Sequence, residues 1–302
     1  MVAVLWGVNF PATTLGLQHF PPLFMVAVRF TLIAVPTILL VPRPQVPLRW
    51  FLGMAIGTGT VQFGLLYVAM AVGMPPGLAS LVLQACAPFT VLLGAVWLRE
   101  HLSGRQVVGV LAAVAGLTVI AVHRGVEGSA AALVPVLLTV AAGLGWAFGN
   151  ICSRQARAPK PLHLTLWMSV VPPVPLLALS LVLEGPRRDW DALRTAPTTA
   201  ALPAVLGLLY IVLVATLVGY GLWNTLLSRN PSSVVAPFAM LVPVAGVLSA
   251  WLFFDEVPDL VELLAGVLVV GGVLYGSYTR RRAASEPVPE AVPEALPERS
   301  RT

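Results

Sequence analysis

The sequence predicts an all-α integral membrane protein in which ten transmembrane helices form two inverted five-helix repeats around a central cavity. Hydrophobic residues make up 58% of the 302 residues and charged residues only 10%, whereas a soluble domain carries about 25% charged residues. Apolar runs long enough to cross a bilayer follow one another along the chain, and features of the first half recur in the second. The lipid bilayer is therefore the expected partner of most of the surface.

Ten apolar runs are predicted to form the helices. Pro residues mark several connections, for example at Pro22, Pro76 and Pro231, because Pro lacks a backbone N–H group and disfavours helical geometry in the residue before it. Most connections are only a few residues long, so successive helices are expected to be antiparallel neighbours. The predicted spans are residues 1–17, 23–41, 50–72, 76–98, 104–122, 130–152, 162–183, 201–227, 232–254 and 260–278.

The first run is short for a transmembrane helix. Seventeen residues rise ~25 Å, whereas the hydrocarbon core of a bilayer is ~30 Å thick. A cleaved signal peptide is the alternative, but the run has no basic residue before it and no clear small-residue cleavage site. We therefore treat it as the first span.

The distribution of basic residues predicts the orientation in the membrane. Thirteen of the Lys and Arg residues fall in the segments on the side of the amino terminus, and the other side holds only Arg124, Arg187, Arg188 and Arg194. Such a bias is typical of cytoplasmic segments, so we expect a multi-pass inner-membrane protein with both termini in the cytoplasm. Because the basic residues are dispersed rather than gathered into one patch, no nucleic-acid partner is expected despite a pI of about 9.8.

Several features recur after about 155 residues, and an amino-terminal block recurs after about 140. Each predicted repeat contains an odd number of spans, so the second copy must be inverted in the membrane. Inverted repeats place a substrate site near the midplane, between halves that can rock. The alternative is chance similarity between Leu- and Val-rich helices. The matched features are Gly64 and Gly219, Pro76 and Pro231, Pro88 and Pro243, Glu100 and Asp255 with Glu256, and residues 6–9 and 146–150.

Three units follow from this division. Residues 1–128 are predicted to form the first repeat and residues 129–279 the second, with an insertion near residues 187–199. From residue 280 onward the chain carries three Arg residues and then alternating Pro and Glu. Such a composition cannot bury enough apolar surface to fold, so residues 280–302 are expected to be a disordered cytoplasmic tail.

Four blocks carry a family resemblance: residues 6–10 (WGVNF), 28–30 (VRF), 73–85 (GMPPGLASLVLQA) and 214–223 (VATLVGYGLW). On these blocks the chain resembles the EamA branch of the drug/metabolite transporter superfamily, from about residue 6 to residue 278. Residues 73–85 are most similar to the bacterial cysteine and O-acetylserine exporters of that branch. The resemblance implies ten helices, a central cavity, alternating access, export from the cytoplasm across a bacterial inner membrane and no cofactor. A second copy of the chain, in a homodimer, is left open as a partner.

Polar side chains inside the spans are the candidates for a substrate site, because each costs free energy there unless it is paired or functional. Arg29 is the only ionisable residue well inside a predicted span. Its guanidinium is a planar fork of donors that matches a carboxylate. The alternative is an Arg that extends toward the membrane surface or binds helix-end carbonyl groups. Asn9 and Asn150 occupy comparable places in the two repeats, where they line the cavity or bond neighbouring helices.

Other polar and aromatic residues extend this set. Ser80 and Gln84 are one helical turn apart and share a face. Aromatic rings, including that of Trp6, can hold an ammonium group against their faces. The predicted substrate-binding residues are Asn9, Arg29, Gln62, Ser80, Gln84, Trp146, Asn150, Tyr220, Trp223 and Asn224.

The absence of Asp and Glu from the middle of the spans limits the chemical classes of substrate that the site could bind. A cation exporter would usually need such a carboxylate, whereas a zwitterion can place its carboxylate on Arg29. Export of small neutral amino-acid metabolites is therefore predicted, and efflux of another small metabolite or drug is the alternative. A membrane enzyme or a structural subunit is less favoured, because no His-Glu-x-x-His motif or Gly-rich phosphate loop is present. His101 and His123 are isolated in the sequence, and Cys86 and Cys152 are expected to be packing residues, so no catalytic residue or metal site is predicted.

Overall fold

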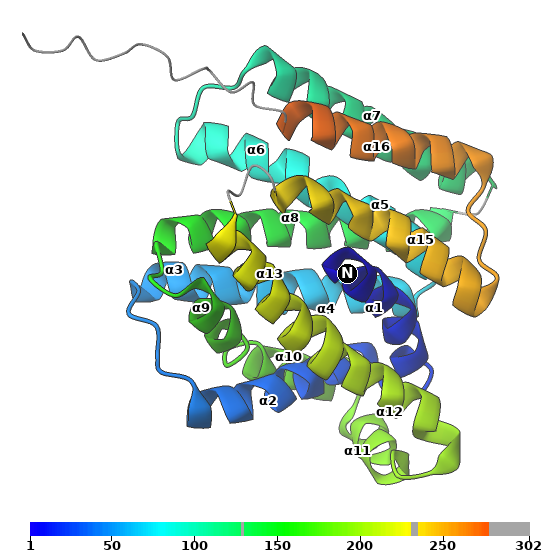
Figure 1. Cartoon of the computed structure of the whole chain (residues 1–302). Helices are drawn as coiled ribbons and strands as arrows, with labels where there is room; N and C mark the ends of the chain where they lie inside the picture. The colour runs from blue at the N-terminus through cyan, green and yellow to red at the C-terminus, as the bar shows by residue number, and fades with distance from the viewer. Residues whose placement is uncertain (128–129, 231–234, 278–302) are drawn as a thin grey trace, which may run out of the picture.

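The computed structural model describes residues 1–127, 130–230 and 235–277, and within these ranges the chain forms helices joined by turns and contains no strand (Figure 1). The predicted tail, residues 280–302, lies outside the described residues. The helices, in chain order, are α1 (Val2–Leu17), α2 (Pro22–Leu40), α3 (Leu48–Met54), η1 (Ala55–Gln62), α4 (Phe63–Ala71), α5 (Pro76–Val82), η2 (Leu83–Ala85), α6 (Cys86–Trp97), α7 (Gly104–Glu127), η3 (Ala130–Ala132), α8 (Leu133–Ala156), α9 (Pro161–Met168), α10 (Pro173–Leu183), α11 (Pro186–Thr195), η4 (Thr199–Ala201), α12 (Leu202–Leu209), η5 (Tyr210–Val218), α13 (Gly219–Arg229), η6 (Ala236–Met240), α15 (Leu241–Phe254) and α16 (Leu260–Ser277).

Eight helical stretches in the described part of the chain are long and apolar enough to cross a membrane. Two further apolar helices, Val2–Leu17 and Phe238–Phe254, are shorter. The chain is thus a multi-pass membrane protein. Of the ten predicted spans, eight meet the criteria of length and composition, and the first and ninth coincide with the two shorter helices.

Two predicted spans are less regular than expected, and one predicted connection is more regular. The span predicted at residues 76–98 contains the 3-10 turn η2 between α5 and α6, and residues 169–172 separate α9 from α10. Pro172 and Pro173 lie at the second break, where each removes a backbone donor. The connection predicted after residue 184 contains the helix α11, which begins at Pro186 and buries Asp189 and Ala192. The sequence predicts only an insertion there and no helix; a first-turn Pro and an amphipathic pattern favour this helix.

Two transmembrane stretches contain π-helical segments, η1 and η5. They begin at Ala55 and Tyr210, so they are separated by the same offset of about 155 residues that relates the two halves of the sequence. π-Helical residues make up well under 1% of globular proteins and are frequent at functional sites. Both segments face the interior of the bundle, where Gln62 and Thr216 are buried.

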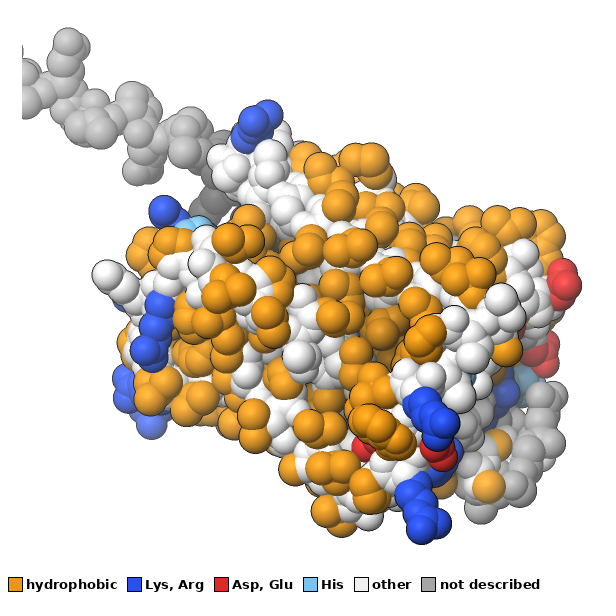
Figure 2. Space-filling view, turned by 90° about the horizontal axis from the view of Figure 1, so that it is seen from below, with side chains coloured by type: hydrophobic (Ala, Val, Ile, Leu, Met, Phe, Trp, Pro, Cys, Tyr) orange, Lys and Arg blue, Asp and Glu red, His pale blue; other side chains and the backbone are white. Residues whose placement is uncertain are grey.

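The outer surface has the charge distribution of a membrane protein. Figure 2 shows a broad hydrophobic band, with charged side chains gathered toward its ends. In Figure 1 the α2–α3, α6–α7 and α8–α9 connections lie together at one end of the bundle, and the α1–α2, α10–α11 and α15–α16 connections lie at the other. We call the first the basic end, with Arg43, Arg49, Arg99, Arg154, Arg157, Lys160 and Arg229, and the second the mixed-charge end, with Arg124, Glu184, Arg187, Arg188, Asp189, Arg194, Glu256, Asp259 and Glu262.

Glycine allows the helices around the interior to approach closely. A Cβ atom at Gly7 of α1 would lie 2.5 Å from the Ala245 Cβ of α15, and one at Gly57 of η1 would lie 2.8 Å from the Gly145 carbonyl oxygen of α8. Side chains at these two positions would force the helices apart. The close crossings bring η1 against α8 and α1 against α15, and so shape the walls of a central cavity.

Candidate functional site

A cavity of about 610 Å³ lies between the helices of both halves of the chain. This volume is in the range of ~300–1,000 Å³ that is typical of small-molecule sites. The lining extends as far as Ser153, which directly precedes Arg154, and Leu227 near the end of α13, so the cavity reaches toward the basic end. All ten residues predicted to bind substrate line this cavity: Asn9, Arg29, Gln62, Ser80, Gln84, Trp146, Asn150, Tyr220, Trp223 and Asn224.

Arg29 lies in the middle of α2 and is only 4% exposed. Its Nη1 donates to the Tyr67 hydroxyl at 2.9 Å, and its Nη2 donates to the Thr216 hydroxyl at 3.2 Å. The guanidinium carbon lies 4.1 Å from the centre of the Phe63 ring. Arg29 therefore does not extend to the membrane surface, and its hydrogen-bond partners are side chains of α4 and η5 rather than helix-end carbonyl groups. Its Nε has no hydrogen-bond partner among the described residues.

The amide side chains differ in how far their hydrogen-bonding capacity is used. Asn224 donates to the Tyr220 carbonyl at 2.8 Å, and Asn150 lies 3.4 Å from the Thr90 hydroxyl. By contrast, the Asn9 Oδ1 and the Gln62 Oε1 are buried without a hydrogen-bond partner in the described part of the chain. An unpaired buried polar atom is costly. Asn9 and Gln62 therefore each hold a buried acceptor oxygen that no described residue uses.

An aromatic cluster joins the two halves of the chain on one side of the cavity. The Trp6 ring lies 5.1 Å from the Tyr220 ring and 5.3 Å from the Trp223 ring, measured between centres. The Trp6 indole N–H donates to the Ala215 carbonyl of η5 at 2.9 Å. Trp6 was not among the ten predicted residues, although its place in the WGVNF block beside Asn9 is a signal that could have included it.

The lining also contains residues that the sequence did not single out. Thr58, Phe63, Thr90 and Thr165 all line the cavity. Phe and Thr are common in transmembrane helices, so nothing in their local pattern distinguishes a lining residue from one that faces lipid. Cys86 also lines the cavity, whereas Cys152 packs in the core; both thiols are free and buried.

Arg29 is the one charged side chain among the described lining residues, and Tyr220 and Cys86 are the other ionisable ones. The nearby helix-end carboxylates serve other contacts. Glu100 forms an ion pair with Arg154 at the basic end, and this hydrogen bond lowers the pKa of Glu100. Glu256 accepts from the backbone N–H of Gly77 at 3.1 Å, at the start of α5, and burial raises the pKa of Glu256.

A second set of carboxylates lies at the mixed-charge end. Glu184 accepts from the backbone N–H groups of Leu23 at 2.8 Å and Phe24 at 3.1 Å. The Ser180 hydroxyl lies 2.6 Å from Glu184 and 2.9 Å from Asp189. A hydroxyl has one proton to donate, so the arrangement is fully satisfied when Asp189 is protonated and donates to Ser180. Burial, with the negative charge of Glu184 as a smaller contribution, raises the pKa of Asp189.

Further polar side-chain contacts link α7 to the start of α16 at the same end. Arg124 and Glu262 are 2.5 Å apart, and His123 and Asp259 are 2.9 Å apart. His123 is thus not isolated in the fold, because a residue 136 positions away in the sequence partners it. No group of three His, Cys, Asp or Glu residues that could hold a metal ion is present in the described ranges.

The sequence pattern of the EamA-like transporter family matches residues 1–122 and 133–278. The chain belongs to the EamA-like transporter family. It is 40% identical over 277 residues to a "Probable amino-acid metabolite efflux pump" of Escherichia coli (strain K12), covering 90% of this chain and 91% of that protein. A relative of the same name in Salmonella typhimurium is 39% identical and covers 94% of this chain and 95% of that protein.

More distant similarities agree with this assignment. A "Probable terminal-alkyne amino-acid exporter" of Streptantibioticus cattleyicolor is 26% identical over 95% of both chains. A protein of known crystal structure shares the fold, with a TM-score of 0.58 and 21% identity over 91% of this chain and 93% of that chain. This EamA-like protein is therefore a membrane transporter, and several of its relatives are named as exporters.

Proposed function

We propose that this EamA-like protein exports small neutral amino-acid metabolites of the cysteine and O-acetylserine type by alternating access between two inverted five-helix repeats. The observation that carries the proposal is the chemistry of the cavity: its described lining offers one guanidinium, several amides and a cluster of aromatic rings, but no carboxylate. This set suits a zwitterion better than a cation, because the only fixed charge is positive.

The unpaired atoms of the cavity suggest how a zwitterion is bound. The Arg29 guanidinium, with its Nε unpaired, is the donor for the substrate carboxylate. The Asn9 Oδ1 and Gln62 Oε1 are acceptors for the ammonium group. The faces of Trp6 and Trp223 add a weaker attraction for the same cation. The Arg29 Nε, the Asn9 Oδ1 and the Gln62 Oε1 would each gain a hydrogen-bond partner that the described residues do not supply.

Two observations support export as the direction. The relatives at 40% and 39% identity are named as efflux pumps. The cavity reaches toward the basic end of the bundle, beside Arg154, and basic segments are typical of the cytoplasmic side. With both termini in the cytoplasm, the cavity is loaded from the cytoplasm and emptied at the mixed-charge end.

Efflux of another small metabolite or drug is a second candidate. The lining contains Met54, Met168 and Met240 beside the aromatic residues, and Met side chains adapt to ligands of different shapes. A larger apolar substrate would use these residues instead of the Arg29 side of the cavity.

Uptake into inverted membrane vesicles tests the proposal. In such vesicles an exporter moves substrate inward, so labelled O-acetylserine or cysteine is expected to accumulate faster than in vesicles without the protein. Uptake of a cationic drug and of a neutral aromatic compound is measured in parallel. Accumulation of either compound without any amino-acid uptake would replace the proposal with the second candidate.

A further inference from the structure

The Arg29 guanidinium is held by residues from both halves of the chain. Tyr67 belongs to α4 in the first half, and Thr216 belongs to η5 in the second. Tyr67 is completely buried and Thr216 is 5% exposed. Neither residue stands in the lining of the cavity. They therefore act on a ligand in the cavity through Arg29 and not by direct contact.

The hydroxyl of Thr216 can only accept from Arg29. It donates its single proton to the Ile211 carbonyl, five residues earlier, at 2.8 Å. Buried Thr residues in the regular helices of this chain donate to the carbonyl four residues earlier, as Thr37 does to Ile33 and Thr139 does to Pro135. The π register of η5 thus changes the direction of the Thr216 hydroxyl. Its remaining lone pairs are available to the Arg29 Nη2.

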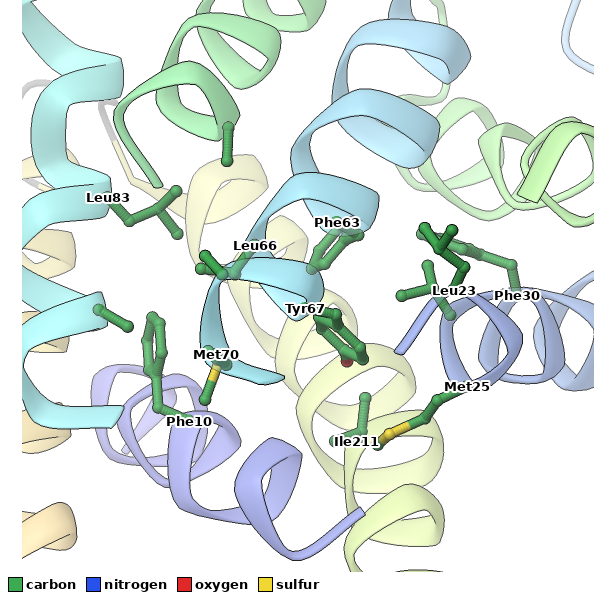
Figure 3. Packing of buried hydrophobic residues seen from close by; sticks show 14 of the residues in the cluster. Phe10, Leu23, Met25, Phe30, Phe63, Leu66, Tyr67, Met70, Leu83 and Ile211 are labelled. Atoms are coloured by element: carbon green, nitrogen blue, oxygen red, sulfur yellow. The ribbon is translucent and has the colours of Figure 1, made fainter. Parts of the chain in front are cut away.

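Aromatic packing fixes the plane of the same guanidinium. The Phe63 ring lies 4.1 Å from the guanidinium carbon and makes edge contacts with Phe30 at 5.5 Å and with Tyr67 at 6.3 Å between ring centres. Figure 3 shows Phe63 and Tyr67 projecting from α4 near Phe30 of α2 and Ile211 of η5. Two hydrogen bonds and one stacking contact together leave the guanidinium a single orientation.

We propose that Tyr67 and Thr216 are positioning residues for substrate binding, which hold the Arg29 guanidinium so that its free N–H groups meet the substrate carboxylate. The inference rests on the proposed function, in which that carboxylate is the ligand of Arg29. An Arg side chain has several rotatable bonds, and fixing them before the substrate arrives lowers the entropic cost of binding. Because the two acceptors come from different halves, a movement of η5 relative to α4 also changes the orientation of Arg29.

Removing one hydroxyl at a time tests this role. Tyr67→Phe and Thr216→Val each remove one acceptor with little change in volume, and Thr216→Ser keeps the hydroxyl. We expect KM for the labelled amino acid to rise about tenfold in the first two variants, with kcat changed much less. Thr216→Ser is expected to restore the wild-type KM. The inhibition constant of the amino-acid methyl ester, which lacks the carboxylate, is expected to stay unchanged in all three.

Two matched control variants measure the effect of losing a hydroxyl that is not bonded to Arg29. The Thr139 hydroxyl donates to Pro135 and the Tyr210 hydroxyl donates to Leu5, and neither residue lines the cavity or contacts Arg29. Thr139→Val and Tyr210→Phe are expected to keep the wild-type KM. Thr216→Ala replaces Thr216→Val if the latter does not reach the membrane in normal amount.

The outcomes separate the two proposals. If the wild-type protein transports no amino acid, the proposed function fails. If it does, and Tyr67→Phe and Thr216→Val leave KM unchanged, only the positioning role is overturned. Equal weakening of amino-acid and ester binding also overturns it, because a general structural defect would not distinguish a ligand with a carboxylate from one without.

Discussion

The two ends of the bundle use their charged groups differently. At the mixed-charge end, carboxylates bind helix starts that are far away in the sequence: Glu184 accepts from Leu23 and Phe24, and Glu256 accepts from Gly77 and Leu78. At the basic end, Glu100 pairs with Arg154 near the surface, with side chains 42% and 59% exposed. Partly buried contacts to helix starts thus join the halves at one end, and an exposed ion pair joins the α6–α7 connection to α8 at the other.

This difference runs parallel to the direction in which the cavity extends. Carboxylates at helix starts satisfy free N–H groups and interact favourably with the helix dipole, whereas exposed ion pairs contribute little to stability. The cavity extends toward the end with the weaker contacts, where Ser153 and Leu227 form part of its lining. The cavity therefore extends toward the basic end of the bundle, whose contacts are the weaker ones.

The largest effect is expected in a test of which end of the bundle faces the cytoplasm, because each reporter lies on one side of the membrane or on the other. Reporter fusions after residues 188 and 280 should report opposite compartments, with the fusion after residue 280 in the cytoplasm. The reason is the excess of Lys and Arg in the segments of the basic end. Activity of both reporters in the same compartment would refute the ten-span topology.

The next largest effect is expected from loss of the contact between Glu256 and the start of α5. Glu256→Ala removes a charged acceptor from the Gly77 and Leu78 N–H groups, so the free energy of unfolding is expected to fall by about 2 kcal/mol. Glu256→Gln keeps one acceptor oxygen and should lose less. Thermal unfolding of the purified protein in detergent gives both values. The matched variant at the basic end, Glu100→Ala, is expected to change stability far less, and a larger loss there would reverse the comparison.

The two ends should also respond oppositely to acid. The pKa of Asp189 is raised, so its contribution to stability is present at low pH and is lost as the pH rises through the folded-state pKa. The pKa of Glu100 is lowered, so its contribution is present at neutral pH and is lost as the pH falls through the folded-state pKa. Unfolding midpoints of the Asp189→Asn and Glu100→Gln variants, measured between about pH 7.5 and about pH 3, report the two effects. Shifts of the same sign in both variants would count against the assignment.

Much of the fold could be predicted from the sequence, because backbone groups inside a membrane must be satisfied within each helix. Apolar length therefore located the eight helical stretches that are long enough to cross a membrane. The cavity residues were predictable for a related reason: a side chain such as Arg29 or Asn150 within an apolar run is costly unless it faces the interior. All ten chosen residues line the cavity.

The remaining features depend on tertiary contacts that no local pattern encodes. The π registers of η1 and η5 occur in sequences that also suit an α-helix, and Thr216 became a partner of Arg29 across 187 residues. The partner of His123 is likewise 136 residues away. The helix α11 was missed because its ten residues are too few and too polar to resemble a span. Trp6 is different, because its place in the WGVNF block beside Asn9 was visible in the sequence, although Trp6 was not among the ten predicted residues.

The role of Arg29 is the central claim of this account, and Arg29→Lys tests it most directly. Lys keeps the positive charge and loses the planar fork that the carboxylate, Tyr67 and Thr216 share. In inverted vesicles with equal amounts of protein, we predict that kcat/KM for O-acetylserine falls at least about tenfold, a loss of about 1.4 kcal/mol or more in transition-state stabilisation. Transport by Arg29→Lys at the wild-type rate would contradict the account.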